Sequence, residues 1–165
     1  MRFIHVSDVH LGMVPDKGKQ WSDIRAKEIE DTFDKILEAA EEKKVDLLLI
    51  AGDLYHSAPK STDLAKLDDR LAKLTNTRTV IIAGSSDHIE KDSPSDTYEF
   101  RSNTVILPAG EINNAYFEDI DTCVTGFSYA QAEYTENFAD GVEAQREGAT
   151  NILLLYGGDS SHGAF

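Results

Sequence analysis

Residues 45–56 read VDLLLIAGDLYH, an apolar run that ends at Gly52 and passes directly into aspartate and histidine. A short apolar segment closed by glycine is typical of a strand buried on both faces of a sheet. Two similar runs, Arg2 to Val6 and Thr79 to Ala83, also lead into segments with aspartate and histidine. The pattern predicts three strands with polar side chains at their ends, and the two later strands are expected to be buried.

Two amphipathic segments separate these strands. Between about Ser22 and Lys44 the apolar residues recur at helical spacing, and a second helix begins at Ser61 or Thr62 with leucines on one face. The first apolar face is Ile29, Phe33, Ile36, Leu37 and Ala40, and the second is Leu64, Leu67, Leu71 and Leu74. Alternating strands and helices predict an α/β fold with parallel strands in its first half.

The second half of the chain shows a less regular pattern. Residues 91–103, KDSPSDTYEFRSN, predict a loop with a helical turn, because proline, serine and aspartate favour turns. Four short strands are expected at Thr104 to Leu107, Tyr116 to Glu118, Cys123 to Thr125 and Asn151 to Tyr156. Their closer spacing indicates a mixed or two-layer sheet. We expect residues 1–165 to form a single domain.

Composition restricts the function and the location. Acidic residues outnumber basic ones by 30 to 16, and the net charge is −14. This charge argues against a surface that binds nucleic acid by itself. The acidic excess fits either a solvated surface or local compensation by bound cations or a basic partner. Cys123 is the single cysteine, and no apolar run has the length of a signal peptide or a membrane span. We therefore expect a cytoplasmic protein that does not enter the membrane.

Chemically active residues follow the strands. Asp8 and His10 follow the first, Asp53 and His56 the second, and SSDH at residues 85–88 the third. Each group alone could form a turn or an exposed hydrogen-bonded pair. The carboxyl ends of parallel strands meet at one edge of a sheet, so their repetition there favours a shared metal site.

The segments DVHLG at residues 8–12 and GDLYH at residues 52–56 resemble the first two motifs of the calcineurin-like metallophosphoesterases. The flanking strands are most similar to the SbcD-type subunits of DNA repair exonucleases. The resemblance covers most of the chain and implies a four-layered αββα sandwich with mixed sheets. It also implies that the chain is the N-terminal part of the family's catalytic domain and is incomplete at its C-terminus.

The resemblance assigns roles to the residues of these two motifs. It implies that Asp8 and His10 bind one Mn²⁺-like ion, and that Asp53 bridges this ion and a second one. A shared carboxylate suits two cations about 3.5–4 Å apart that polarise a phosphodiester and generate hydroxide from water. His56 matches a family position that either lies near the substrate or supports the metal ligands. We expect His56 to contribute to catalysis from there.

The third motif departs from the family pattern G-N-H-D. Here it reads Gly84, Ser85, Ser86 and Asp87, so a serine replaces the asparagine ligand of the second ion. Ser86 replaces the histidine that serves the leaving group, and it cannot supply a proton at neutral pH. Asp87, the partner of that histidine in the family, keeps its catalytic assignment. His88 is close in sequence, but we expect its side chain to point in a different direction from that of residue 86.

The later motifs are also altered. Tyr156 stands where the family has a metal-ligand histidine at the end of a strand, and a neutral phenol is a poor ligand for Mn²⁺ or Zn²⁺. The final G-H-x-H motif does not occur, since His162 is the only histidine after His88. We therefore expect one tight Mn²⁺ site and a second site that is weak or absent.

Three functions agree with this sequence. The first is a metal-dependent phosphodiesterase of the DNA repair exonuclease type with a weakened dinuclear site. The second is a catalytically degenerate module that binds without hydrolysis, and the third is a hydrolase of small phosphoesters, which suits the acidic surface better than duplex DNA. The SbcD resemblance further implies DNA and an SbcC-like ATPase as partners.

Overall fold

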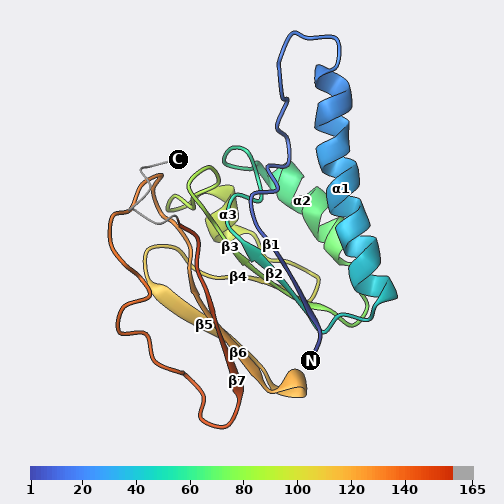
Figure 1. Ribbon diagram of the computed structural model, residues 1–165. Helices are drawn as coiled ribbons and strands as arrows, with labels where there is room; N and C mark the ends of the chain where they lie inside the picture. Colours follow the sequence, from blue (N-terminus) through green and yellow to red (C-terminus); the bar gives the residue numbers. More distant parts are fainter. Residues whose placement is uncertain (158–165) are drawn as a thin grey trace.

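The first sheet is parallel throughout, with the strands in the order β1 (Phe3–Val6), β2 (Leu47–Ala51), β3 (Arg78–Ile82) and β4 (Thr104–Ile106). The computed structural model describes residues 1–157 (Figure 1). Its elements are β1 (Phe3–Val6), α1 (Ser22–Glu42), β2 (Leu47–Ala51), α2 (Ser61–Leu71), β3 (Arg78–Ile82), α3 (Pro94–Thr97), β4 (Thr104–Ile106), β5 (Ile112–Phe117), a 3₁₀ turn (Glu118–Ile120), β6 (Thr122–Phe127) and β7 (Thr150–Leu154). Because β1, β2 and β3 run in the same direction, the loops after them meet at one edge.

The second sheet is mixed, with the order β5-β6-β7. Strands β5 and β6 are antiparallel, while β6 and β7 are parallel. Figure 1 shows this sheet on one side of the parallel sheet and helices α1 and α2 on the other. The described chain therefore forms three layers, helix on sheet on sheet.

Strand β2 supplies both cores because all five of its residues are buried. Leu48 and Ile50 pack with α1 and α2 residues, including Phe33 and Leu67. Leu47, Leu49 and Ala51 lie on the opposite face in the core shared with the second sheet. Alternate side chains of a strand point to opposite faces, so a strand between two layers must be apolar throughout. This explains why the apolar run before Gly52 is uninterrupted.

The expected elements are present, with shifted ends. Helix α1 ends at Glu42, near the expected Lys44, and the helical turn expected within residues 91–103 is α3. Strand β5 starts at Ile112, four residues before the expected Tyr116, and ends at Phe117. Asn113 and Asn114 are poor strand formers, but pairing with β6 outweighs their local preference.

The described residues provide three of the four layers of the expected αββα arrangement. Within residues 1–157, no helix follows β6, and the segment 130–149 that leads to β7 is irregular. Gly141 and Gly148 in this segment both have positive φ, which interrupts helical geometry. His162 lies outside the described residues. None of the helices in the described part combines the length and apolar character needed to cross a membrane.

A buried carboxylate anchors the loop after α3 to helix α2. Asp68 is fully buried and accepts hydrogen bonds from the backbone N–H groups of Arg101 and Ser102 at 3.1 and 3.2 Å. The Arg101 Nε donates to the same carboxylate at 2.8 Å. These contacts connect the segment that follows the third motif to the helical layer.

Candidate metal centre

The loops after β1 and β2 are held together by backbone hydrogen bonds. Asp8 N donates to Gly52 O at 3.1 Å, His10 N to Asp53 O at 3.0 Å, and Leu11 N to Leu54 O at 2.8 Å. The two loops therefore continue the parallel pairing of their strands for several residues. This pairing sets the first two motifs side by side.

The three expected metal ligands share an unusual backbone conformation. Asp8, His10 and Asp53 have φ values of 54°, 54° and 49°, in the left-handed region that residues other than glycine seldom adopt. Such residues concentrate at functional sites, where the surrounding structure enforces a costly conformation. The left-handed residues turn the chain sharply at the ends of both strands.

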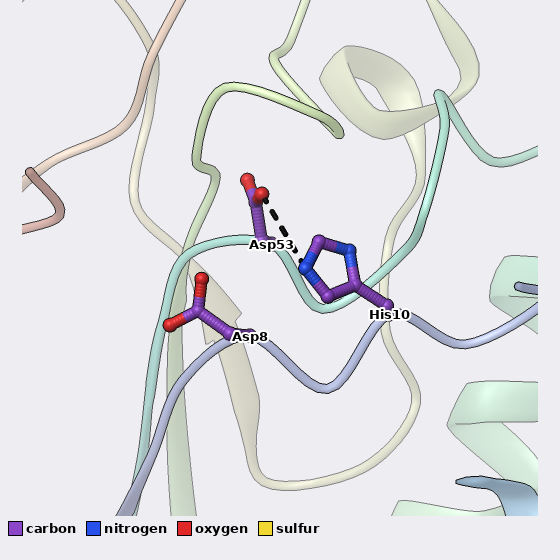
Figure 2. Close-up of side chains that lie close together, drawn as sticks. All are labelled: Asp8, His10 and Asp53. Atoms are coloured by element: carbon purple, nitrogen blue, oxygen red, sulfur yellow. Dashed lines mark ion pairs between the residues drawn. The ribbon is translucent and has the colours of Figure 1, made fainter. Parts of the chain in front are cut away.

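Their side chains converge at the edge of the parallel sheet, as expected. One ligand atom from each of Asp8, His10 and Asp53 lies within 4.8 Å of the other two (Figure 2). The His10 Nε2 is 3.9 Å from Asp53 Oδ2. Asp53 is 3% exposed, whereas Asp8 is exposed, so the cluster has a buried base and an open side.

The loop after β3 supports Asp53 directly. Ser86 donates its backbone N–H to Asp53 Oδ1 at 2.9 Å and its hydroxyl to Oδ2 at 2.7 Å. A Cβ atom at Gly84 would lie 2.3 Å from Asp53 Oδ1 and 2.7 Å from the Asp53 backbone nitrogen. Glycine is therefore required at residue 84 for the loop to approach this carboxylate so closely.

Ser85 and Tyr156 form a hydroxyl pair beside Asp53. Ser85 Oγ is 3.1 Å from Tyr156 Oη and 3.5 Å from Asp53 Oδ2. The Tyr156 ring packs over Gly52, where an added Cβ would come within 2.2 Å of a ring carbon. Burial raises the pKa of Tyr156, and the charges of Asp53 and Asp8 raise it further, so the phenol remains protonated at neutral pH.

His56 is exposed and lies against the ring of His10. The two ring centroids are 5.5 Å apart in an edge-to-face arrangement. The His10 Nδ1 is buried and has no hydrogen-bond partner among residues 1–157, although the second nitrogen of a metal-ligating histidine is usually hydrogen-bonded. Packing, including the contact with His56, thus contributes to the orientation of the His10 ring.

Asp87 connects two loops. It accepts hydrogen bonds from Tyr55 N at 3.0 Å and from Gly84 N at 2.8 Å. Burial raises the pKa of Asp87, and the nearby charge of Asp53 adds to this effect, against backbone hydrogen bonds from Tyr55, Gly84 and Asp53 that lower the pKa. Asp87 therefore orients the loops after β2 and β3, even without the histidine that the family motif places before it.

His88 makes its polar contacts outside the cluster. Its Nδ1 is 3.0 Å from Ser85 O, and its Nε2 is 3.5 Å from a carboxylate oxygen of Glu90. The structure thus gives no sign that His88 takes over from the histidine missing at residue 86.

Sequence reasoning missed two supporting residues. The contact of Ser86 with Asp53 joins residues 33 positions apart, and no local pattern indicates it. Asp68, in contrast, carried a signal, because it stands on the leucine face of α2, next to Leu67 and three residues before Leu71. An acid on an apolar helix face indicates a buried partner, and here the partners are Arg101 and Ser102.

The donor set fits a divalent metal ion. Two carboxylates and one imidazole are the ligand types that Mn²⁺ and Zn²⁺ accept, and three protein ligands leave room for water or substrate. The open side beside Asp8 gives access to that position. An α/β sandwich with this cluster at its strand ends has a candidate site for a divalent metal ion.

The family follows from comparison with known proteins. The chain belongs to the calcineurin-like phosphoesterase family, whose sequence profile matches residues 1–163. Members of this family bind divalent metal ions. The resemblance seen in the first two motifs is thereby confirmed over nearly the whole chain.

The curated relatives are DNA repair proteins and nuclease subunits. The chain is 35% identical over 91 residues to the DNA double-strand break repair protein Mre11 of Methanopyrus kandleri, a match that covers 53% of this chain and 19% of the relative. It is 30% identical over 114 residues to the SbcD component of the nuclease SbcCD of Escherichia coli K12, which covers 67% of this chain and 27% of the relative. The Mre11 protein of Archaeoglobus fulgidus is 32% identical over 95 residues, or 56% of this chain and 20% of the relative. The matches thus span about a fifth to a quarter of these relatives.

Proposed function

We propose that this chain is a divalent-metal-dependent phosphodiesterase of the DNA repair nuclease type. The observation that carries the proposal is the convergence of Asp8, His10 and Asp53 within 4.8 Å in a member of the calcineurin-like phosphoesterase family. Relatives named as a nuclease subunit and as double-strand break repair proteins support a phosphodiester substrate.

Asp8, His10 and Asp53 would hold the ion, and Mn²⁺ suits their mixed oxygen and nitrogen donors. A bound divalent ion supplies positive charge that polarises a phosphate group and lowers the pKa of water. Asp53 keeps its position through Ser86, and Asp87 fixes the two loops that carry them. His56, which is exposed beside His10, would contact a substrate or its leaving group.

One tightly bound ion is the proposed stoichiometry. The side of Asp53 that faces the third and fourth motifs carries the hydroxyls of Ser85, Ser86 and Tyr156. Neutral hydroxyls are weaker ligands than the asparagine and histidine of the family pattern. A second ion would therefore bind loosely or not at all, and turnover would be slow.

The proposed partners are DNA and an SbcC-like ATPase, in accordance with the SbcCD name of the Escherichia coli relative. Because the net charge is −14, a bound cation or a basic partner would have to offset repulsion from the phosphate backbone. We propose that residues 1–165 form a single metallophosphoesterase-like domain that acts in the cytoplasm.

Turnover of two model substrates tests the proposal. With Mn²⁺, the chain should hydrolyse bis(p-nitrophenyl) phosphate faster than p-nitrophenyl phosphate, and Asp53→Asn should abolish both hydrolysis and Mn²⁺ binding. Faster hydrolysis of the monoester would favour a hydrolase of small phosphoesters. Inertness towards both compounds, with Mn²⁺ bound, would favour a binding module without catalysis.

A further inference from the structure

The hydroxyl groups beside Asp53 differ in whether their hydrogen is already used in a strong hydrogen bond. Each hydroxyl carries one hydrogen. The Ser86 hydroxyl donates it to Asp53 Oδ2 at 2.7 Å. Ser85 Oγ and Tyr156 Oη share one hydrogen bond of 3.1 Å, which uses one of their two hydrogens.

The second hydrogen of this pair makes only a long hydrogen bond within the protein. Ser85 Oγ donates to Asp53 Oδ2 at 3.5 Å, well beyond the usual O–H···O distance, and the same oxygen accepts the shorter bond from Ser86. A closer acceptor from outside could therefore replace this long contact. Both side chains are partly exposed, so such an acceptor has access.

This donor pair is next to the candidate metal ligands. Asp53 Oδ2, which lies 3.5 Å from Ser85 Oγ, is also the oxygen that lies 3.9 Å from His10 Nε2. A phosphate bound at the cluster would thus have a carboxylate–imidazole metal site on one side and two neutral hydroxyls on the other. Non-bridging phosphate oxygens are strong hydrogen-bond acceptors.

The charges around the cluster favour a monoanion. Asp8 and Asp53 together offset a divalent ion, and a neutral imidazole adds no charge. Across residues 1–157, no Lys or Arg side chain forms a hydrogen bond or an ion pair with Asp8, Asp53, Ser85 or Tyr156. The second negative charge of a phosphomonoester would therefore lack a counter-charge beside two carboxylates.

We propose that Ser85 and Tyr156 form a phosphate-binding donor pair that holds a non-bridging oxygen of a phosphodiester monoanion and disfavours phosphomonoester dianions. This inference rests on the proposed function, because it requires a metal ion at Asp8, His10 and Asp53. It gives the two altered motif residues a binding role in place of a lost metal site.

The test measures binding apart from turnover. The Mn²⁺-loaded protein is titrated at pH 8 with dimethyl phosphate, a monoanion, and with methyl phosphate, a dianion, and binding is followed through the broadening of the ³¹P resonance by Mn²⁺. Tyr156→Phe keeps the ring over Gly52 and removes only the hydroxyl, and Ser85→Ala removes the other one. Tyr116→Phe is the matched control, because the hydroxyl of this β5 residue bonds Asp121, which precedes β6.

We expect Tyr156→Phe and Ser85→Ala each to weaken dimethyl phosphate binding by about three- to tenfold, the value of one hydrogen bond. Mn²⁺ affinity should change by less than about twofold in each variant, since neither removes a metal ligand. Unchanged dimethyl phosphate binding in both variants, with Mn²⁺ bound normally, would overturn the donor pair alone. Equal or tighter binding of methyl phosphate to the unmodified chain would overturn the selectivity. Failure of the unmodified chain to bind Mn²⁺ would overturn the proposed function and this inference with it.

Discussion

Ser86 holds both carboxylate oxygens of Asp53, with its backbone N–H 2.9 Å from Oδ1 and its hydroxyl 2.7 Å from Oδ2. One residue thus fixes the plane of the most buried carboxylate in the cluster. At this position the family pattern has a histidine that serves the leaving group. Here the serine supports a candidate metal ligand. The sequence had indicated only that residue 86 cannot supply a proton.

Removal of the Ser86 hydroxyl should weaken metal binding. Groups that orient metal ligands typically contribute 10- to 100-fold in affinity, so Ser86→Ala should lower Mn²⁺ affinity by about tenfold. Ser86→Thr keeps a hydroxyl and should retain most of the affinity. Calorimetric titration measures both, with Ser57→Ala at an exposed position as the control. Equal affinities in Ser86→Ala and the unmodified chain would show that the backbone N–H suffices.

Gly84→Ala should damage the same carboxylate from another direction. The added Cβ would lie 2.3 Å from Asp53 Oδ1 and 2.7 Å from the Asp53 backbone nitrogen. A rotation of the Asp53 side chain alone would therefore not remove the clash. Overpacking of this kind costs about 1–3 kcal/mol, and displacement of Asp53 should reduce Mn²⁺ affinity as well. Urea unfolding and calorimetric titration measure the two effects.

Gly141→Ala is the matched control for this change. An added Cβ there meets no atom of the described residues within 4 Å, so only the strain of its φ of 73° remains. The control should lose some stability but should bind Mn²⁺ as the unmodified chain does. Similar Mn²⁺ affinities in Gly84→Ala and Gly141→Ala would contradict the close packing of Gly84 on Asp53.

Asp68→Asn should change the dependence of stability on pH. Burial acts to raise the pKa of Asp68, but hydrogen bonds from Arg101 and Ser102 outweigh it and hold the pKa below the ordinary value of 3.8. The charged form is therefore favoured by folding, and its contribution to stability is complete above the unfolded-state pKa of about 3.9. This contribution is lost as the pH falls through the lower pKa of the folded state.

Urea unfolding at pH 7, 4 and 3 tests this relationship. At pH 7, Asp68→Asn should lower the free energy of unfolding by about 1–3 kcal/mol, because charge-assisted hydrogen bonds are lost. The difference from the unmodified chain should shrink at pH 3. Asp69→Asn is the control, since that carboxylate also bonds Arg101 but is largely exposed. A constant difference at all three pH values would contradict the lowered pKa of Asp68.

The sequence predicted the parts of this molecule that depend on local pattern. The apolar run that ends at Gly52 identifies a strand between two layers, and parallel strands place Asp8 and Asp53 at one edge. These inferences need only the side-chain period of a strand and the direction of its neighbours. The three expected metal-ligand side chains do converge for that reason.

Other features depend on contacts that the sequence does not specify. The hydrogen bonds from Ser86 to Asp53 follow from the way the loop after β3 folds over the end of β2. Strand β5 extends through Asn113 and Asn114 because β6 lies beside it, although neither residue favours strands. Such partners are fixed by tertiary packing, and a single sequence carries little trace of them.

The last prediction tests whether the altered motifs limit the metal stoichiometry. The combined variant Ser85→Asn, Ser86→His and Tyr156→His restores the residue types of the family pattern and offers ligands to a second ion. Calorimetric titration should show the number of bound Mn²⁺ ions per chain rising from about one to two, although loss of the Ser86 hydroxyl should weaken binding of the first ion by about tenfold. Diesterase turnover should also rise more than in any single variant, because ligands of one site act as a unit and single repairs leave it incomplete.

The hydroxyl donors lost from residues 85 and 156 are neutral, so a second cation would attract the phosphate more strongly than they do. If the folded triple variant still binds a single ion, the serines and the tyrosine are not what excludes the second metal. The place of Ser86 would then be explained by its support of Asp53, and that of Ser85 and Tyr156 by substrate binding.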